Sequence, residues 1–383
     1  MTEPKVVAKR TSTLHDFPYE GPLRKCFHPW IINVTPPGRA HCVHDCTFCY
    51  AREAIYADTD DTPKVYGNLP ELVERDLERL ELAPPVLLST TTDPCQPVAA
   101  VREQTDRLVR LLIDRGISFA LITKGDPAFL GEIPGFWEYE RKYLSVSIEG
   151  GPPVIELLSP GAASYETRIN AVRTAARNAT KVAVRLDPYL VHVWRGVHGE
   201  HWWRATEGLI AEFAEAGARH VTVGTGRLDN RTPRSHGRSM LERLVGIVHD
   251  RLSPDLADQM RADYVYGRSG TCRGYVLRHD LREELHDRIR DACERYGMTY
   301  GACQERPASA DSAGIAHCGG FALPFARRGP DGRFHAIDGC TACCHVQCAG
   351  NPDPPCGRPE LAQPKPYRPA ALKAPRQRAL EMN

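Results

Sequence analysis

The stretch HCVHDCTFCYAR, residues 41–52, places three cysteines at C-x3-C-x2-C spacing in one short loop. This spacing lets three thiolates converge on one face of a metal cluster. Cysteine thiolates are the ligands of iron–sulfur clusters, and a 4Fe–4S cubane takes four ligands. Three cysteines therefore leave one iron open for another molecule. The alternative is a zinc site in which His41 or His44 supplies the fourth ligand, since Cys3His zinc sites exist.

The segments around this loop predict a parallel α/β fold. The apolar run WIINV at 30–34 is typical of a buried strand, and it leads directly into the cysteine loop. Further strands are expected at 86–88, 117–122, 143–148, 182–184 and 220–223, with helices between them at 69–81, 99–115, 164–179 and 202–217. This alternation predicts βαβ units. Right-handed crossovers would curl six units into a partial (β/α)6 barrel of the TIM type, closed by helices at 238–252 and 279–297.

Length and composition narrow the class of protein. A chain of 383 residues can form one large domain with an appendage. The formal net charge of +1 argues against broad non-specific binding to nucleic acid, so a basic patch has to be local. No run approaches the length of a membrane span, and the N-terminus lacks an apolar signal region, so a cytoplasmic protein without a membrane partner is expected. Fourteen cysteines in such a protein indicate metal or redox chemistry rather than disulfides.

The distribution of cysteines divides the chain into four parts. We expect an N-terminal arm at 1–28, the barrel with its closing helices at 29–298, a cysteine-rich extension at 299–356 and a Pro-rich tail at 357–383. The extension contains seven cysteines: Cys303, Cys318, Cys340, Cys343, Cys344, Cys348 and Cys356. Two groups of thiols indicate two metal centres, and a C-x2-C pair alone does not distinguish zinc from iron.

The cysteine loop and the strand ends together resemble the radical SAM enzymes, and more closely the branch around spore photoproduct lyase. The superfamily signature is C-x3-C-x2-C with an aromatic residue before the last cysteine, here Phe48. TDPCQP at 92–97 resembles the second-strand loop of that branch, where relatives usually have T-D-P-Y-Q-P. TKG at 123–125 and SVSI at 145–148 resemble its third and fourth strand ends. The resemblance covers residues 30–230.

This resemblance implies a 4Fe–4S cluster whose open iron binds S-adenosylmethionine (SAM). Reduction by a donor such as flavodoxin or ferredoxin would cleave SAM to a 5′-deoxyadenosyl radical that takes hydrogen from the substrate. The cluster ligands carried over are Cys42, Cys46 and Cys49. The cofactor contacts carried over are Phe48 near the adenine, Thr92 and Asp93 at the SAM amino group, and Lys124, Ser147 and Arg185 for the carboxylate and ribose. For the last three, an ordinary solvated strand-end residue is an equally good interpretation.

Two further features of the cysteines bear on the chemistry. Cys95 stands where relatives usually have tyrosine, and it is either a buried structural residue or a catalytic thiol that gives a hydrogen atom to the radical. The extension resembles SPASM and twitch domains, which implies an auxiliary 4Fe–4S cluster. The preferred auxiliary ligands are Cys303, Cys318, Cys340 and Cys343, with Cys344 and Cys348 as substitutes. The extension lacks the full SPASM run, so one auxiliary cluster is expected.

A run of arginines after the sixth strand indicates the substrate. Arg227, Arg231 and Arg234 lie in the loop 224–238, and arginine forks suit phosphate or carboxylate; a solvated, salt-bridged loop is the alternative. We therefore expect a small phosphorylated, nucleotide-type substrate rather than nucleic acid. The surplus thiols would suit sulfur insertion, as in the exchange of ring oxygen for sulfur in thionucleoside (albomycin) antibiotic biosynthesis.

Two other functions remain open from the sequence. The first is repair of a pyrimidine lesion in DNA, as in spore photoproduct lyase, although that enzyme lacks a cysteine-rich extension. The second is a non-catalytic iron–sulfur or zinc protein that senses redox state or binds nucleic acid.

Overall fold

A seven-stranded sheet forms the centre of the computed structural model, which describes residues 3–15, 23–27, 29–38, 40–52, 54, 56–228, 238–269, 272–344, 346–362 and 368–373. The strand order is β12-β9-β8-β7-β6-β5-β2, and every neighbouring pair is parallel. The strands are β2 (Trp30–Ile32), β5 (Val86–Leu88), β6 (Phe119–Thr123), β7 (Lys142–Ser147), β8 (Lys181–Leu186), β9 (His220–Val223) and β12 (Thr299–Ala302). The prediction of an α/β protein with a parallel sheet is therefore confirmed, and all six expected strands are present.

The central strands are buried on both faces, which explains why they appear as apolar runs rather than as alternating patterns. All six residues of β7 are buried. The strand order follows the chain, so each strand pairs with the next through one crossover. The carboxyl ends of all seven strands consequently meet at one edge of the sheet, where the polar loops gather.

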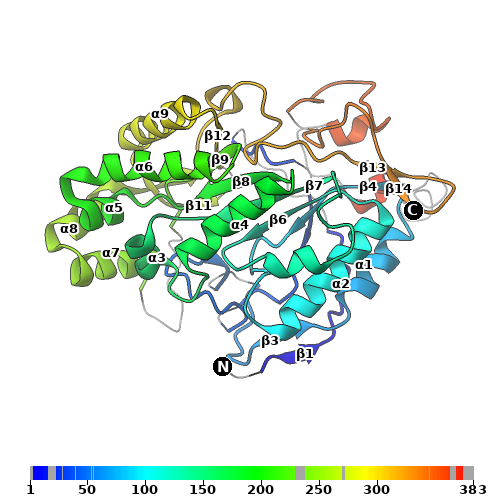
Figure 1. The fold of residues 1–383 in the computed structure, drawn as a ribbon, viewed down its shortest axis with the longest axis horizontal. Helices are drawn as coiled ribbons and strands as arrows, with labels where there is room; N and C mark the ends of the chain where they lie inside the picture. The colour runs from blue at the N-terminus through cyan, green and yellow to red at the C-terminus, as the bar shows by residue number, and fades with distance from the viewer. Residues whose placement is uncertain are drawn as a thin grey trace.

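Helices cover this sheet (Figure 1). The expected helices are present as α1 (Leu69–Leu77), α2 (Ala99–Arg115), α4 (Tyr165–Arg177), α6 (Trp202–Glu215), α7 (Met240–Arg251) and α9 (His279–Arg295). Helix α2 buries Val101, Leu108 and Leu112, as their spacing predicts. The prediction missed the shorter helices α3 (Pro152–Leu158), α5 (Val191–His198) and α8 (Pro254–Asp263), as well as the hairpin of β10 (Tyr264–Ser269) and β11 (Cys272–Leu277).

The cysteine-rich extension is joined to the body through two sheets. β12 lies within the segment expected to form the extension, yet it pairs with β9 as an edge strand of the main sheet. Farther along, β13 (Ala326–Arg328) pairs with β14 (Phe334–Ala336) and with β4 (Leu82–Ala83). Figure 1 shows these three strands at the end of the molecule opposite α5, α7 and α8. A boundary at residue 299 would therefore cut the main sheet.

The N-terminal arm and the Pro-rich tail also pack against the body. β1 (Lys5–Val7) pairs in parallel with β3 (Lys64–Tyr66). In the described part of the tail, Leu372 is buried and Lys373 forms a β-bridge with Leu80. Within the described ranges, no helix combines the length and the apolar character needed to cross a bilayer.

Candidate active site

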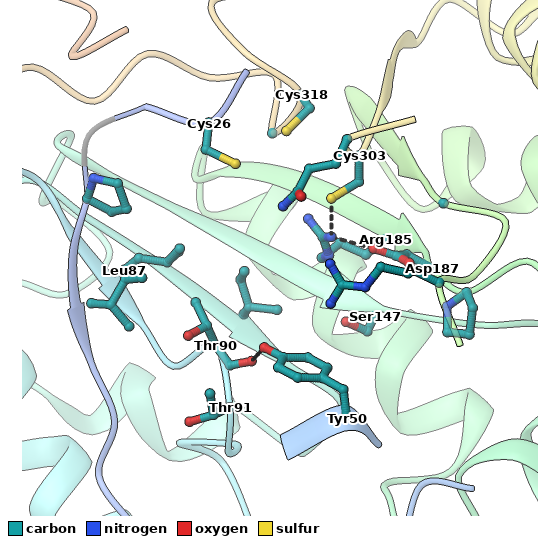
Figure 2. A pocket seen from close by; sticks show the side chains of 18 of the residues that line it. Cys26, Tyr50, Leu87, Thr90, Thr91, Ser147, Arg185, Asp187, Cys303 and Cys318 are labelled. Atoms are coloured by element: carbon teal, nitrogen blue, oxygen red, sulfur yellow. Dashed lines mark hydrogen bonds and ion pairs between the residues drawn. The ribbon is translucent and has the colours of Figure 1, made fainter. Parts of the chain in front are cut away.

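A cavity of about 560 Å³ opens at the carboxyl ends of the strands (Figure 2). Loops after parallel strands meet at this edge, which is where α/β proteins place their ligands. The lining includes five of the residues that the sequence predicted for cofactor or substrate contacts: Phe48, Lys124, Ser147, Arg185 and Arg227. The structure thus brings together residues from five separate strand ends and loops.

Hydrogen bonds from the backbone of loop 42–49 hold it against two other segments of the chain. Val43 N donates to Gln96 Oε1 at 2.9 Å, and Thr47 N donates to Leu158 O at 2.9 Å. The three thiols are half-buried and form no disulfide. Burial raises the pKa of Cys42 to about 12 and that of Cys46 well above its usual value. A metal has to displace these protons, since thiolates are the binding form.

The carboxylate of Asp93 ties this loop to the end of β6. It lies 3.1 Å from His44 Nε2 and accepts hydrogen bonds from Lys124 N at 2.6 Å, Thr123 Oγ1 at 2.7 Å and Cys95 N at 2.8 Å. Burial would raise the pKa of Asp93, but the charge and hydrogen bond of His44 and the other donors lower it to about 2. Asp93 does not line the cavity. These partners fix the Asp93 carboxylate in place, and its contact with the SAM amino group stays a prediction.

Two neighbouring threonine hydroxyls have no described partner, although Thr92, like Asp93, does not line the cavity. Thr91 Oγ1 and Thr92 Oγ1 are buried, and neither has a hydrogen-bond partner among the described residues. Thr91 lines the cavity. An orphaned buried hydroxyl destabilises a protein unless a ligand satisfies it. The sequence pointed to Thr92 but not to Thr91, although the run TTTDP was available as a signal.

A buried ion-pair network fixes Lys124 beside Phe48. Lys124 Nζ lies 3.0 Å from Glu149 Oε1 and 5.4 Å from the centre of the Phe48 ring. Arg168 Nη1 holds the other oxygen of Glu149 at 2.6 Å. Burial would raise the pKa of Glu149, but the charges of Lys124 and Arg168 lower it. The sequence reading missed Glu149 and Arg168; the signal for Glu149 was an acidic residue directly after a strand.

Three sulfur atoms gather at the other end of the cavity. Figure 2 shows Cys26, Cys303 and Cys318 close to one another, above Arg185. Arg185 Nη2 lies 3.6 Å from Cys303 Sγ and 2.5 Å from Asp187 Oδ2. Sequence reasoning missed Cys26 because it stands alone in the chain.

The predicted auxiliary ligands are not gathered as one group. Cys303 and Cys318 line the cavity together with Cys26, whereas Cys340 and Cys343 do not line it. The thiol of Cys343 donates to the carbonyl oxygen of Lys25 at 3.7 Å. Cys344 lies near Cys340, Cys348 and Cys356, whose charges add to burial in raising its pKa.

The remaining predicted residues differ in their position relative to the cavity. Cys95 is fully buried and does not line the cavity, so the structure favours its packing role over hydrogen donation. Arg227 lines the cavity, whereas Arg231 and Arg234 lie outside the described residues.

No three His, Cys, Asp or Glu side chains of the described part are set around one point as ligands of a single metal ion. The ligands of an iron–sulfur cubane each bind a different iron, so a cluster does not require that convergence. Each of the two groups of three cysteines offers the thiols that an iron–sulfur cluster requires. The threonine hydroxyls that have no described partner could bind a polar cofactor.

Comparison with known proteins gives a likeness of fold. No family model matches the chain, and no curated protein sequence matches it. Among solved structures, a cysteine-to-serine mutant of spore photoproduct lyase is 19% identical with a TM-score of 0.55, over 78% of this chain and 81% of that one. Another mutant of the same enzyme, with bound AdoMet and dinucleoside spore photoproduct, is 19% identical with a TM-score of 0.51, over 72% and 75%. The chain therefore shares the fold of spore photoproduct lyase.

Proposed function

We propose that this protein is a radical SAM enzyme acting on a small, phosphorylated nucleoside-type substrate. The observation that carries the proposal is the position of the C-x3-C-x2-C loop at the carboxyl edge of a parallel sheet, beside a cavity lined by Phe48, Lys124 and Ser147. The shared fold supports it, because a relative of that fold has been solved with bound AdoMet. The sheet would then form a partial (β/α)6 barrel around the cavity.

Within this proposal, Cys42, Cys46 and Cys49 hold a 4Fe–4S cluster that leaves one iron for SAM. When bound, the cluster would supply the electron for reductive cleavage of SAM, which it would receive from a flavodoxin or ferredoxin. The protein holds and orients: Thr91 and Thr92 offer hydroxyls to the SAM amino group, and Phe48 flanks the adenine. The His44–Asp93 pair fixes the loop against β6.

The cavity also has the features expected for an anionic substrate. Arg227 lines it, and an arginine fork binds phosphate in a bidentate manner. The three sulfurs at its far end support an auxiliary iron–sulfur cluster within reach of a bound substrate. Sulfur insertion, such as the exchange of ring oxygen for sulfur in a thionucleoside, is the reaction that an auxiliary cluster in this position would suit.

Anaerobic incubation of the reconstituted protein with SAM, dithionite and a panel of nucleotides tests the proposal. We expect 5′-deoxyadenosine and a product heavier than one nucleotide by the mass difference between sulfur and oxygen. The control is the variant with Cys42, Cys46 and Cys49 replaced by alanine, which should release no 5′-deoxyadenosine. A wild-type protein that binds only zinc, or that never cleaves SAM, would exclude the radical SAM function.

Repair of a DNA pyrimidine lesion is the second candidate, favoured by the fold shared over most of spore photoproduct lyase. It predicts binding to duplex DNA that weakens steeply as salt rises, because phosphate contacts release counterions. Absence of such binding at low salt would count against repair and leave the small-substrate proposal standing.

A further inference from the structure

We propose that Cys26, Cys303 and Cys318 are the ligands of the auxiliary iron–sulfur cluster, and that this cluster presents an open iron to the cavity. The inference rests on the proposed function and deepens it, because it assigns ligands and an orientation to that cluster. It adds Cys26, from the N-terminal arm, to a site expected from the extension alone.

The three cysteines come from distant segments, and the sheet positions two of them. Cys303 directly follows β12, and its N–H donates to Val223 O at 2.7 Å, which continues the pairing with β9. The carbonyl oxygen of Cys318 accepts hydrogen bonds from Thr222 Oγ1 at 2.8 Å and from the His220 ring at 2.9 Å. Both loops are therefore fixed to β9.

A buried ion pair positions Cys26. The adjacent Lys25 Nζ lies 2.6 Å from Asp311 Oδ1, with both side chains almost fully buried. Asp311 Oδ1 also accepts a hydrogen bond from Ala302 N at 2.9 Å, at the end of β12. The arm is thus attached to the residue that precedes Cys303. The segment that carries Cys26 is therefore packed against the body rather than lying free on the surface.

The side chains of the three cysteines share one space. All three line the cavity. Figure 2 shows their sulfurs at one end of the cavity. Arg185, 3.6 Å from Cys303 Sγ, supplies positive charge beside them. Sulfur donors next to a partly buried cation suit a cluster bound by thiolates, whose negative charge the guanidinium would offset.

Two described side chains beside the three cysteines that could supply a fourth ligand are hydrogen-bonded to other groups. The thiol of Cys343 donates to Lys25 O. The ring of His317 is used on both sides, since Nε2 lies 2.8 Å from Phe321 O and Nδ1 accepts from Gly319 N at 3.0 Å. Three thiolates leave one iron of a cubane without a protein ligand. Because all three cysteines line the cavity, that iron would be open to a sulfide, a thiolate or a substrate heteroatom in it.

Iron analysis in a background that lacks the first cluster tests the ligand assignment. The background carries Cys42→Ala, Cys46→Ala and Cys49→Ala and is reconstituted anaerobically with iron and sulfide. Adding Cys26→Ser, Cys303→Ser and Cys318→Ser should remove about four irons per chain and the matching EPR signal of the reduced protein. Adding Cys340→Ser and Cys343→Ser instead should leave both unchanged, as should Cys293→Ser, which replaces a buried thiol of α9 away from the cavity.

The outcomes separate the ligand assignment from the proposed function. Iron retained after loss of the three cysteines, iron lost with Cys340 and Cys343, zinc in place of iron, or a background that binds no iron would each overturn the assignment. Because the triple replacement could impair folding, Cys26→Ser alone is compared with Cys293→Ser at matched melting temperature. It should change the EPR signal, and an unchanged signal would exclude Cys26. A wild-type protein that holds this cluster but never cleaves SAM would overturn the proposed function only.

The open iron has its own readout. Imidazole, a small nitrogen ligand for iron, should shift the EPR g values of the reduced background protein. An unchanged spectrum would mean that a fourth protein ligand completes the cluster, and it would overturn the open position.

Discussion

Thr92 carries a buried hydroxyl that no described residue satisfies, one position before an aspartate whose carboxylate has four partners. The two side chains therefore differ in their hydrogen bonding, although the sequence analysis predicted that both contact SAM. Asp93 organises the backbone of the loop, while Thr92 and Thr91 retain their hydrogen-bonding capacity. This contrast makes the threonines the better test of cofactor binding.

Replacing Thr92 with valine keeps the shape of the side chain and removes the hydroxyl. Loss of one hydrogen bond to a charged amino group costs about 1.5 kcal/mol, so the dissociation constant for SAM should rise about tenfold. Isothermal titration calorimetry on the reconstituted protein measures it. The matched control is Thr105→Val, whose hydroxyl donates to Pro94 O at 2.8 Å. That variant should lose about 1 kcal/mol of stability with unchanged SAM affinity, and equal affinity in Thr92→Val would contradict the assignment.

The buried amine of Lys142 should make stability depend on pH. Burial lowers the pKa of Lys142 from 10.5 to about 8, although its Nζ donates to the carbonyl oxygens of Trp137 and Tyr139. Between these two values the unfolded chain binds more protons than the folded one, so the free energy of unfolding gains a contribution that rises with pH.

Denaturant unfolding of the wild type and of Lys142→Met across that window measures the effect. The difference in free energy of unfolding, wild type minus variant, should increase from about pH 8 upward. A difference that stays flat with pH would show that Lys142 titrates alike in both states.

At the scale of elements, the loop 317–321 depends on its close approach to β9. Gly320 has φ of 84°, and a Cβ there would lie 2.4 Å from His220 Cγ. Gly314 has a similar φ of 79°, but no atom lies within 4 Å of its Cβ position. The two glycines share a left-handed backbone and differ only in the available space.

Alanine at either glycine should therefore separate backbone strain from crowding. Each variant should lose about 1 kcal/mol because of the left-handed conformation. Gly320→Ala should lose more and should also bind less iron, since the alanine displaces the loop that carries Cys318. Urea unfolding and iron analysis of both variants check this, and equal losses in both would mean that the loop tolerates displacement.

At the scale of the whole molecule, the extension contributes a strand and buried contacts to the main domain. β12 forms an edge of the main sheet, and Glu305 accepts hydrogen bonds from Thr225 N at 2.9 Å and from Thr225 Oγ1 at 2.9 Å. Its carboxylate also lies 2.7 Å from His286 Nε2 on α9. Burial would raise the pKa of Glu305, but these contacts lower it. Residues 299–305 therefore join the extension to the end of β9 and to α9.

A chain that ends at residue 298 should fail to fold cooperatively. It exposes the edge of β9 and leaves Thr225 and His286 without their buried carboxylate, which costs several kcal/mol when one partner of a buried pair is removed. Circular dichroism during thermal unfolding measures the loss. The control chain ends at residue 373, which is the last described residue, and should unfold like the full chain. A cooperative transition in the shorter chain would show that the body is complete without β12.

The sequence predicted most of the fold because the information was local. Each central strand is an apolar run and each main helix has a regular apolar face, so six strands and six helices could be recognised segment by segment. β12 escaped recognition because TYGA is short and precedes a cysteine-rich loop. The short helices α3 and α8 escaped recognition because seven and ten residues show too few turns of a periodic apolar face.

The sequence by itself determined the parallel α/β architecture and the cysteine loop at 42–49, because hydrophobic periodicity and close ligand spacing are properties of neighbouring residues. Only the tertiary structure decided that Asp93 contacts both His44 and the end of β6, that Cys95 lies in the core, and that Cys26 lines the same cavity as Cys303 and Cys318. The physical reason is tertiary packing: β12 adds Cys303 to the sheet beside β9, and the Lys25–Asp311 pair brings the segment of Cys26 to it, so thiols that are remote in sequence become neighbours in space. The spacing of the cysteines along the chain does not reveal that they are close in space.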